Sequence, residues 1–136
     1  MNTEISLNTT RDRLWEALTT PSEIEKYFVG TKVSVDWVVG QRITWTGEWE
    51  GKEYKEWADI IEFTPKERIV FDYFSPAAGL PDSEENYNRV TQEITGSDGD
   101  LKLIVKQEGI KDEETSKHME DNWNRILRVI KSMVES

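Results

Sequence analysis

The sequence predicts an α+β fold in which a seven-stranded antiparallel sheet curves around one long C-terminal helix. Three observations lead to this fold class. The end of the chain repeats apolar residues at the spacing of one helical face. The middle is a series of strand-like segments joined by turns, which are too short for the crossovers that parallel strands need. The chain, residues 1–136, has the length of a single domain with one core.

The first 30 residues predict one strand followed by two short helices. Alternation of apolar and polar residues over 5–7 indicates the strand. Asn8 or Thr9 is placed to cap the first helix, whose apolar residues are Leu14, Trp15 and Leu18. Segment 20–23, Thr-Pro-Ser-Glu, has the spacing of a capping box with proline at the first helical position. It begins a second helix that is expected to end by Gly30.

Six further segments are rich in Val, Ile, Thr and aromatic residues and predict strands. Turn residues separate them, and alternation assigns each an apolar face. Segment 54–63 is the exception, because its apolar residues fall on both faces. A β-bulge would allow apolar residues from both sets to face inward, but the sequence does not fix its position. The inward-facing residues of this strand are therefore not assigned. The six segments are 32–37, 41–50, 54–63, 68–74, 87–94 and 101–107.

The last helix has the strongest periodic signal in the chain. Asp112 is a plausible N-cap, followed by two acidic residues in the first turn. A helix of about 22 residues is about 33 Å long at ~1.5 Å per residue. Its broad apolar face needs a sheet to cover it. That face consists of Met119, Trp123, Ile126, Leu127, Ile130, Met133 and Val134.

The composition excludes several classes of function. Asp and Glu total 27 against 17 Lys and Arg, a net charge of −10, which argues against a nucleic-acid partner. The chain has no cysteine, and no cluster of metal ligands stands out, so we expect neither a metal nor a cofactor. No apolar run approaches the ~20 residues of a membrane span. The N-terminus has no signal-peptide pattern, so we expect a cytoplasmic protein.

Three segments resemble motifs of a known family. Residues 10–19 (TRDRLWEALT) match a helix of the form x-x-x-x-V-W-x-A-L-T, and residues 62–71 (EFTPKERIVF) are similar to E-V-x-P-P-x-R-L-V-F. His118 with Trp123 resembles H-x-x-x-G-W in a final helix. Together with the order of elements, they resemble the START-like superfamily, and within it the branch related to the C-terminal domain of the activator of Hsp90 ATPase. The resemblance covers roughly residues 3 to 135.

The resemblance implies a helix-grip fold, shared with polyketide cyclases, birch-pollen allergen relatives and coenzyme Q-binding proteins. It implies that a small hydrophobic or amphipathic molecule, such as a lipid, binds between sheet and helix. Two positions depart from the family pattern: Gly40-Gln41 replaces a Gly-Gly pair, and Asn122 replaces the glycine before Trp123. The sequence does not include the separate N-terminal domain of eukaryotic Hsp90 activators, so Hsp90 activation is not expected.

We expect seven inward-facing residues to surround the ligand. Gln92 is the most informative, because an inward amide needs a hydrogen-bond partner, and a ligand, a water, Tyr73 or a backbone group would each serve. The loop over 75–86 is either a lid with Leu80 as its plug or an acidic hairpin tip. The seven residues are Trp45, Phe71, Tyr73, Gln92, Leu103, Trp123 and Leu127.

Two alternatives to ligand binding stay open. The chain is an interaction module, with a chaperone as a possible partner, if Trp49 or Trp57 forms an exposed patch on the outer face of the sheet. It is an enzyme of the cyclase or hydrolase kind if an acid–base pair points into the cavity. His118, the only histidine, is more simply a surface residue, so the sequence identifies no catalytic residue.

Overall fold

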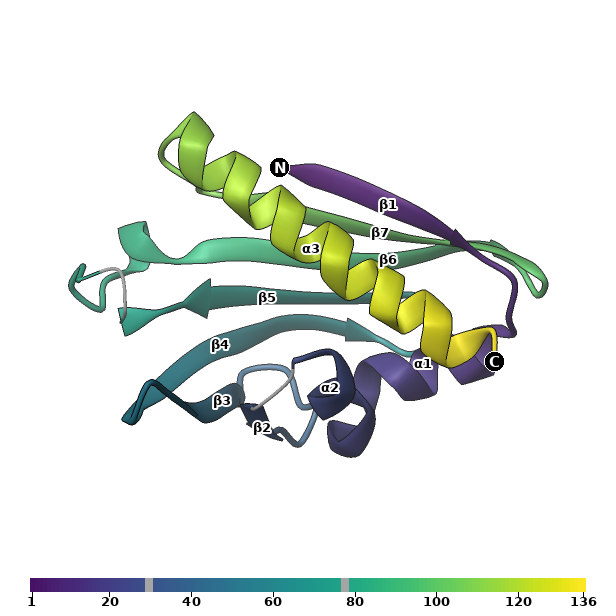
Figure 1. The fold of residues 1–136 in the computed structure, drawn as a ribbon, viewed down its shortest axis with the longest axis horizontal. Coiled ribbons are helices and arrows are strands. Elements are labelled where there is room, and N and C mark those ends of the chain that lie inside the picture. Colours follow the sequence, from purple (N-terminus) through teal and green to yellow (C-terminus); the bar gives the residue numbers. More distant parts are fainter. Residues whose placement is uncertain (29–30, 77–78) are drawn as a thin grey trace.

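The computed structural model describes residues 1–28, 31–76 and 79–136, apart from the side chain of Trp49. One long helix lies across a sheet, and two short helices stand beside it (Figure 1). The strands are β1 (Asn2–Leu7), β2 (Thr31–Ser34), β3 (Arg42–Trp49), β4 (Lys52–Thr64), β5 (Arg68–Phe74), β6 (Asn88–Ser97) and β7 (Asp100–Glu108). The helices are α1 (Arg11–Thr19), α2 (Pro21–Tyr27), the short 3₁₀ helix η2 (Glu84–Asn86) and α3 (Glu113–Val134).

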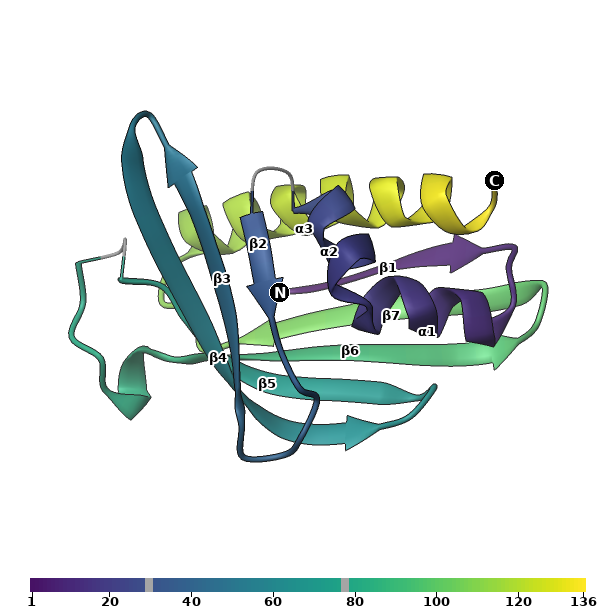
Figure 2. The ribbon, with the colours of Figure 1, turned by 90° about the horizontal axis from the view of Figure 1, so that it is seen from below.

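The seven strands form one antiparallel sheet in the order β1-β7-β6-β5-β4-β3-β2. The sheet is strongly curved: β3 and β4 rise beside α3, while β1, β6 and β7 lie beneath it (Figure 2). The concave face and α3 enclose the core. The predicted α+β, helix-grip architecture is confirmed.

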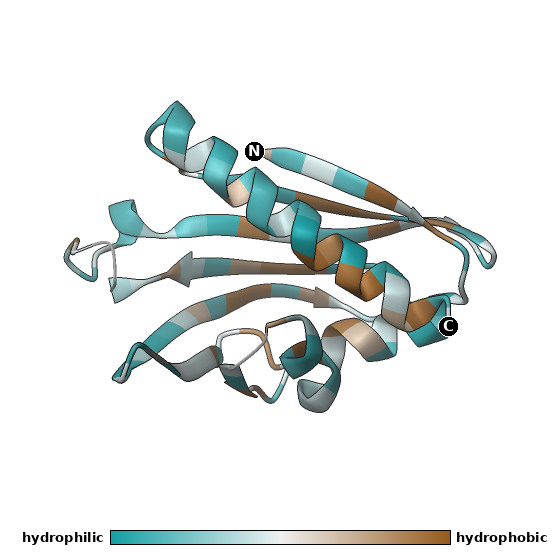
Figure 3. Ribbon diagram, in the orientation of Figure 1, coloured by the Kyte–Doolittle hydropathy of each residue, from teal (hydrophilic) through white to brown (hydrophobic). Residues whose placement is uncertain are grey.

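Helix α3 buries mainly its C-terminal half against the sheet. Asp112 caps it as expected, with its Oδ1 accepting from the Thr115 amide at 2.7 Å. Hydrophobic bands concentrate in the second half of the helix, whereas the first half is largely hydrophilic (Figure 3). The sheet is therefore tightly covered at one end of α3 and less so at the other. The buried residues of α3 are Trp123, Ile126, Leu127, Ile130 and Val134.

A β-bulge in β4 explains why the apolar residues of segment 54–63 change parity. The pairing with β5 shifts register between Ile60 and Glu62, so Ile61 has no partner. Ala58 and Ile60 face inward before the bulge, and Phe63 faces inward after it. Ile61 is exposed. The inward set that the sequence left open is thus Glu56, Ala58, Ile60 and Phe63.

The caps of the two short helices differ from the prediction. Helix α1 is capped by Thr10 rather than Asn8 or Thr9, because the Thr10 hydroxyl accepts from the Arg13 amide at 3.1 Å. Thr20 makes no side-chain cap on α2, although Pro21 begins that helix as predicted. The carboxylate of Glu23, expected to complete a capping box, instead contacts Arg13 and Lys26, each at 2.9 Å. Helix α2 ends at Tyr27, and Gly30 lies outside the described residues.

Strand boundaries differ most around β2. The strand predicted over 32–37 covers only Thr31–Ser34, because the chain turns at Trp37, whose φ of +55° is incompatible with an extended strand. The Trp37 indole Nε1 donates to the Thr19 carbonyl at 2.6 Å, and its ring stacks on Phe63 at 5.3 Å between centroids. These two contacts hold Trp37 in the left-handed region.

Candidate functional site

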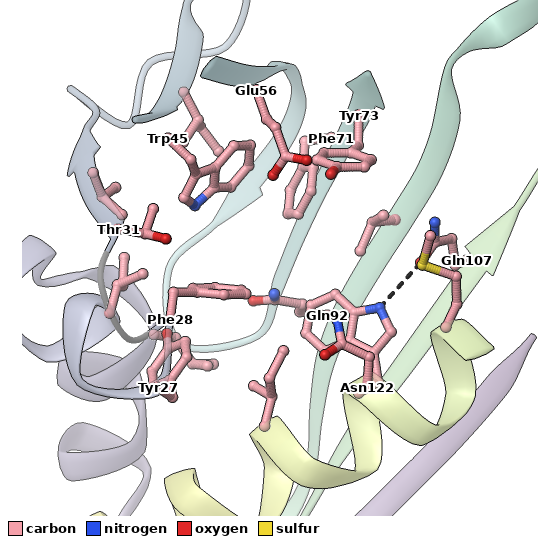
Figure 4. Close-up of a pocket in the computed structure, with 18 of the residues that line it drawn as sticks. Tyr27, Phe28, Thr31, Trp45, Glu56, Phe71, Tyr73, Gln92, Gln107 and Asn122 are labelled. Carbon is pink, nitrogen blue, oxygen red and sulfur yellow. Dashed lines mark hydrogen bonds between the residues drawn. The ribbon is translucent and has the colours of Figure 1, made fainter. Parts of the chain in front are cut away.

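A pocket of about 280 Å³ lies between the concave face of the sheet and the N-terminal half of α3 (Figure 4). It exists where α3 has few apolar side chains, so that helix and sheet are not in full contact. Helix α2 and the first residues of β2 form its third side. Its lining is mostly apolar and aromatic, and the polar groups among the described lining residues are those of Tyr27, Thr31, Trp37, Trp45, Glu56, Tyr73, Gln92, Gln107, His118, Asn122 and Trp123.

Five of the seven residues predicted around a ligand line this pocket. They come from four separate elements: Trp45 from β3, Phe71 and Tyr73 from β5, Gln92 from β6 and Trp123 from α3. Leu103 and Leu127 are fully buried but lie in the packed core outside the pocket lining. Alternation identifies an inward side chain, but it does not show where along the helix the packing opens.

Phe28, which follows α2 as its C-terminal cap, lies at the centre of an aromatic network in the pocket (Figure 4). Its ring centroid is 6.5 Å from that of Trp45 and 6.4 Å from that of Trp123, both in edge-on geometry. Trp45 in turn contacts Phe71 at 5.9 Å and Tyr73 at 5.8 Å. Phe28 therefore connects the sheet to α3 through aromatic contacts. Phe28 is not among the residues predicted around the ligand, because a residue just past a helix end has no periodic signal.

Gln107 on β7 is a second residue that the sequence analysis missed. It is only 2% exposed, and its Oε1 accepts a hydrogen bond of 3.0 Å from the indole Nε1 of Trp123. This bond satisfies both polar groups and fixes the orientation of the indole at the pocket wall. The alternation of Leu101, Leu103 and Val105 continues to position 107, so the sequence does contain the signal for an inward glutamine.

Glu56 brings a carboxylate to the pocket from the less regular start of β4. Its Oε2 accepts from the Ser75 hydroxyl at 2.7 Å, and Tyr73 points toward the same carboxylate (Figure 4). Burial, followed by the charge of Glu56, raises the pKa of Tyr73 well above its usual value. The phenol is therefore protonated at neutral pH and is a hydrogen-bond donor. Glu56 forms no ion pair with any residue in the described part of the chain.

The Gln92 amide projects into the middle of the pocket, near Phe28 (Figure 4). The side chain is half-buried. Among the residues drawn, the dashed hydrogen bond joins Trp123 to Gln107, and none joins Gln92 to Tyr73 or to another group. The amide thus offers both a donor and an acceptor to whatever occupies the pocket.

The loop over 75–86 does not close the pocket in the part that the structure describes. Leu80, the expected plug, is 44% exposed and is not among the lining residues, and residues 77 and 78 lie outside the described range. The loop instead folds back on itself: Asn86 Nδ2 donates to the Pro81 carbonyl at 2.9 Å, and the Tyr87 hydroxyl donates to Asp82 at 2.6 Å. Its anchor is Tyr87, which stacks on Phe74 at 5.1 Å on the outer face.

The outer face of the sheet does not present Trp57 as an open aromatic surface. Its indole Nε1 donates to the Tyr87 hydroxyl at 2.9 Å, and the Arg42 guanidinium lies over its ring, 5.4 Å from the centroid. Cross-strand ion pairs of 2.9 Å, Arg42 with Asp59 and Arg89 with Asp72, occupy the same face. Trp57 is half-buried under these groups, and the side chain of Trp49 lies outside the described part.

His118 lies at the rim of the pocket and is exposed. Across residues 1–28, 31–76 and 79–136, no three His, Asp or Glu side chains are grouped to hold a metal ion. None of the described helices is long and apolar enough to cross a bilayer. The absence of metal and cofactor remains a prediction.

Comparison with known proteins identifies the family. The sequence model described as "Activator of Hsp90 ATPase homolog 1-like protein" matches residues 8–135. The chain belongs to this family. The match to this AHSA1-like family covers nearly all of the chain, as the three motifs predicted. No curated protein matches the chain.

Solved structures agree with the AHSA1-like assignment. A solution structure from Cytophaga hutchinsonii is 35% identical, with a TM-score of 0.85 over 99% of this chain and 94% of its own. A crystal structure from Chromobacterium violaceum is 19% identical (TM-score 0.79, 100% and 97% covered), and it supports the fold alone. The solution structure of an Aha1 dimer from Colwellia psychrerythraea is 14% identical (TM-score 0.77, 99% and 95% covered). The AHSA1-like fold is therefore shared across this set.

Proposed function

We propose that this AHSA1-like domain binds a small, largely apolar molecule in the pocket between the sheet and α3. The observation that carries the proposal is the Gln92 amide, which projects toward Phe28 in a pocket also lined by Phe71 and Trp123, without a hydrogen bond to the residues drawn around it. The Gln92 side chain is half-buried, so its amide is accessible from the pocket and can hydrogen-bond to water or to a ligand there. A ligand with one polar group would satisfy it and would cover the aromatic walls at the same time.

The size of the pocket limits the ligand. An apolar cavity of about 150 Å³ holds one benzene molecule. A pocket of about 280 Å³ therefore has room for two fused rings or for one ring with a short chain. A ligand of about 12 non-hydrogen atoms that gains about 0.5 kcal/mol per atom reaches about 6 kcal/mol, a Kd of tens of micromolar. Larger sterols and long fatty acids do not fit without movement of α2 or α3.

The experiment compares wild type with a variant whose pocket is filled. In Gln92→Phe, we expect the phenylalanine ring to fill the space beside position 92 and to abolish binding of naphthalene and 1-naphthalenemethanol. Isothermal titration calorimetry measures the binding of both molecules. Thr91→Phe is the matched control, because Thr91 directly precedes Gln92 on β6 and points to the opposite face of the sheet. Equal binding by both variants and wild type would overturn the proposal.

Interaction with a chaperone is the second candidate function. Val38, Val39 and Ile61 are each at least 41% exposed, and the turn that carries the two valines is hydrogen-bonded beside the bulge, from the Gly40 amide to the Ile60 carbonyl at 3.0 Å. Exposed apolar residues that lie together are a feature of contact surfaces. If no small molecule binds the pocket while Val39→Asp abolishes binding of Hsp90, this second function replaces the first. A cytoplasmic location is part of the same expectation.

A further inference from the structure

We infer that the pocket selects organic cations: its ligand carries a protonated amine that faces Glu56. The inference rests on the proposed function, since it names the class of molecule that the same pocket takes. The described lining residues include one carboxylate, Glu56, and no Lys or Arg, and the one imidazole, His118, is exposed at the rim.

The Glu56 carboxylate has hydrogen-bond partners but forms no ion pair among the described residues. The Ser75 hydroxyl donates to it at 2.7 Å, and the Tyr73 phenol lies beside it. Both are neutral donors, and no ion pair within the described residues involves Glu56. An anion in a largely apolar pocket without a cation is a favourable partner for a ligand cation, because attraction between charges is stronger there than in water.

The walls around Glu56 suit a cation as well. Trp45 is the cross-strand neighbour of Glu56, and the rings of Trp45, Phe71 and Tyr73 gather on the same side of the pocket as the carboxylate (Figure 4). Trp45 meets Tyr73 at 72° and 5.8 Å, so the two rings present faces in different directions. Aromatic faces attract ammonium groups, most strongly where water is excluded. A carboxylate and three aromatic rings therefore favour an alkylammonium head group over a neutral one.

The same charge distribution opposes anionic ligands. A carboxylate ligand would bring a second negative charge next to Glu56, with no Arg or Lys in the described lining to neutralise it. The protein's net charge of −10 adds a weaker, general repulsion. Fatty acids and other carboxylates are thus poor ligands, even where their apolar parts fit. A ligand that pairs its amine with Glu56 would place its rings toward Phe28 and Gln92.

Three molecules with one ring system and different head groups test the inference. 1-Naphthylmethylamine, 1-naphthalenemethanol and 1-naphthoate are titrated at pH 7 and 0.15 M salt, and Kd values come from ¹H–¹⁵N NMR shifts. We expect the amine to bind about tenfold more tightly than the carboxylate, with the alcohol between them. Glu56→Gln, which keeps an acceptor for Ser75, should bring the three Kd values together.

Glu53→Gln is the matched control for Glu56→Gln. It removes the same charge from the same strand, but Glu53 is exposed and lies outside the pocket lining. It should keep the preference for the amine, which separates a local effect from general attraction to an acidic protein. The inference is wrong if the three head groups have equal Kd values in wild type, or if the preference for the amine survives in Glu56→Gln. In either case, binding of the alcohol still supports the proposed function. If none of the three binds, both are wrong.

Discussion

The indole Nε1 of Trp123 donates a hydrogen bond to Gln107 Oε1 at 3.0 Å, and both side chains are buried. This contact joins α3 to β7 at the boundary between the packed core and the pocket. On the core side, Leu127 and Ile130 complete the cover of the sheet. On the other side, the helix is largely hydrophilic and the pocket begins. The bond thus positions Trp123, the first buried residue of α3 along the chain.

Removing one partner of this bond should destabilise the domain. Gln107→Leu leaves the Trp123 N–H buried without an acceptor, which costs about 1–3 kcal/mol in free energy of unfolding. The double variant Gln107→Leu with Trp123→Phe has no unpaired donor. We expect its loss in free energy of unfolding to be smaller than the sum of the losses in the two single variants. Urea unfolding of the four proteins measures both quantities. Additive changes would contradict the account of this bond.

The Trp123 indole also stabilises the domain by packing, in addition to its hydrogen bond. Trp123→Ala should cost about 3–5 kcal/mol, which leaves a domain of this size marginal or unfolded. Met119→Ala, one turn earlier on the same face and half-buried at the pocket, should cost clearly less. Thermal melts followed by circular dichroism compare them. A Trp123→Ala protein that melts within a few degrees of wild type would show that the indole is not part of the core.

The nearly buried carboxylate of Glu23 should make stability depend on pH in the acid range. Hydrogen bonding from Lys26 is the largest cause that lowers its pKa, and Arg13 adds to it, while burial acts in the opposite direction. A lowered folded-state pKa means that the stabilisation is complete above the usual value near 4.5 and is lost as the pH falls through the folded value. Glu23→Gln should therefore be about 1–3 kcal/mol less stable than wild type at pH 7, with the difference shrinking below pH ~4.

Glu16→Gln is the control for this pH effect. Glu16 also pairs with Arg13 at 2.9 Å, but its side chain is 59% exposed, so its loss should change stability by less than about 1 kcal/mol. Urea unfolding at pH 7, 5, 4 and 3 gives the comparison. A difference between wild type and Glu23→Gln that stays constant from pH 7 to 3 would show that the ion pairs do not stabilise the fold.

The end of β6, where Gly96 pairs with Leu101 next to the turn into β7, requires glycine at position 96 for two reasons. Its φ is +93°, and a Cβ there would lie 2.3 Å from the backbone oxygen of Asp100. Gly51 also has a positive φ, of +80°, but nothing lies within 4 Å of its Cβ position. Gly51→Ala should thus cost about 1 kcal/mol from backbone strain alone, and Gly96→Ala at least ~2 kcal/mol because the strands must move apart. Equal costs in urea unfolding would mean that the turn relaxes freely.

Periodicity accounts for the parts of this structure that could be predicted. The spacing of apolar residues in α3 and the alternation along β5, β6 and β7 place side chains on faces, which is why Phe71, Gln92 and Trp123 were assigned inward from the sequence. Glu56 could not be assigned, because the bulge at Ile61 breaks the alternation of β4. Phe28 lies past a helix end, where no repeat constrains it.

The boundary between core and pocket depends on packing rather than on pattern. Leu103 and Leu127 have the same inward signal as Trp45 and Phe71, yet they fill the closed end beneath the apolar half of α3. The loop over 75–86 had no apolar pattern to fix its direction. Its direction is set by the next residue, Tyr87, which Phe74 and Trp57 hold on the outer face of the sheet. Both outcomes come from contacts between residues far apart in the chain.

The most direct test of the central claim is an NMR map of a bound two-ring molecule. Saturating the wild-type protein with 1-naphthalenemethanol and following amide and indole shifts locates the site without any mutation. We predict that the largest shifts cluster at Phe28, Phe71, Gln92 and the Trp123 indole, while Val70 and Trp57 on the outer face remain unchanged. Shifts confined to outer-face residues, or none at saturating concentrations, would contradict the claim that this pocket binds a ligand.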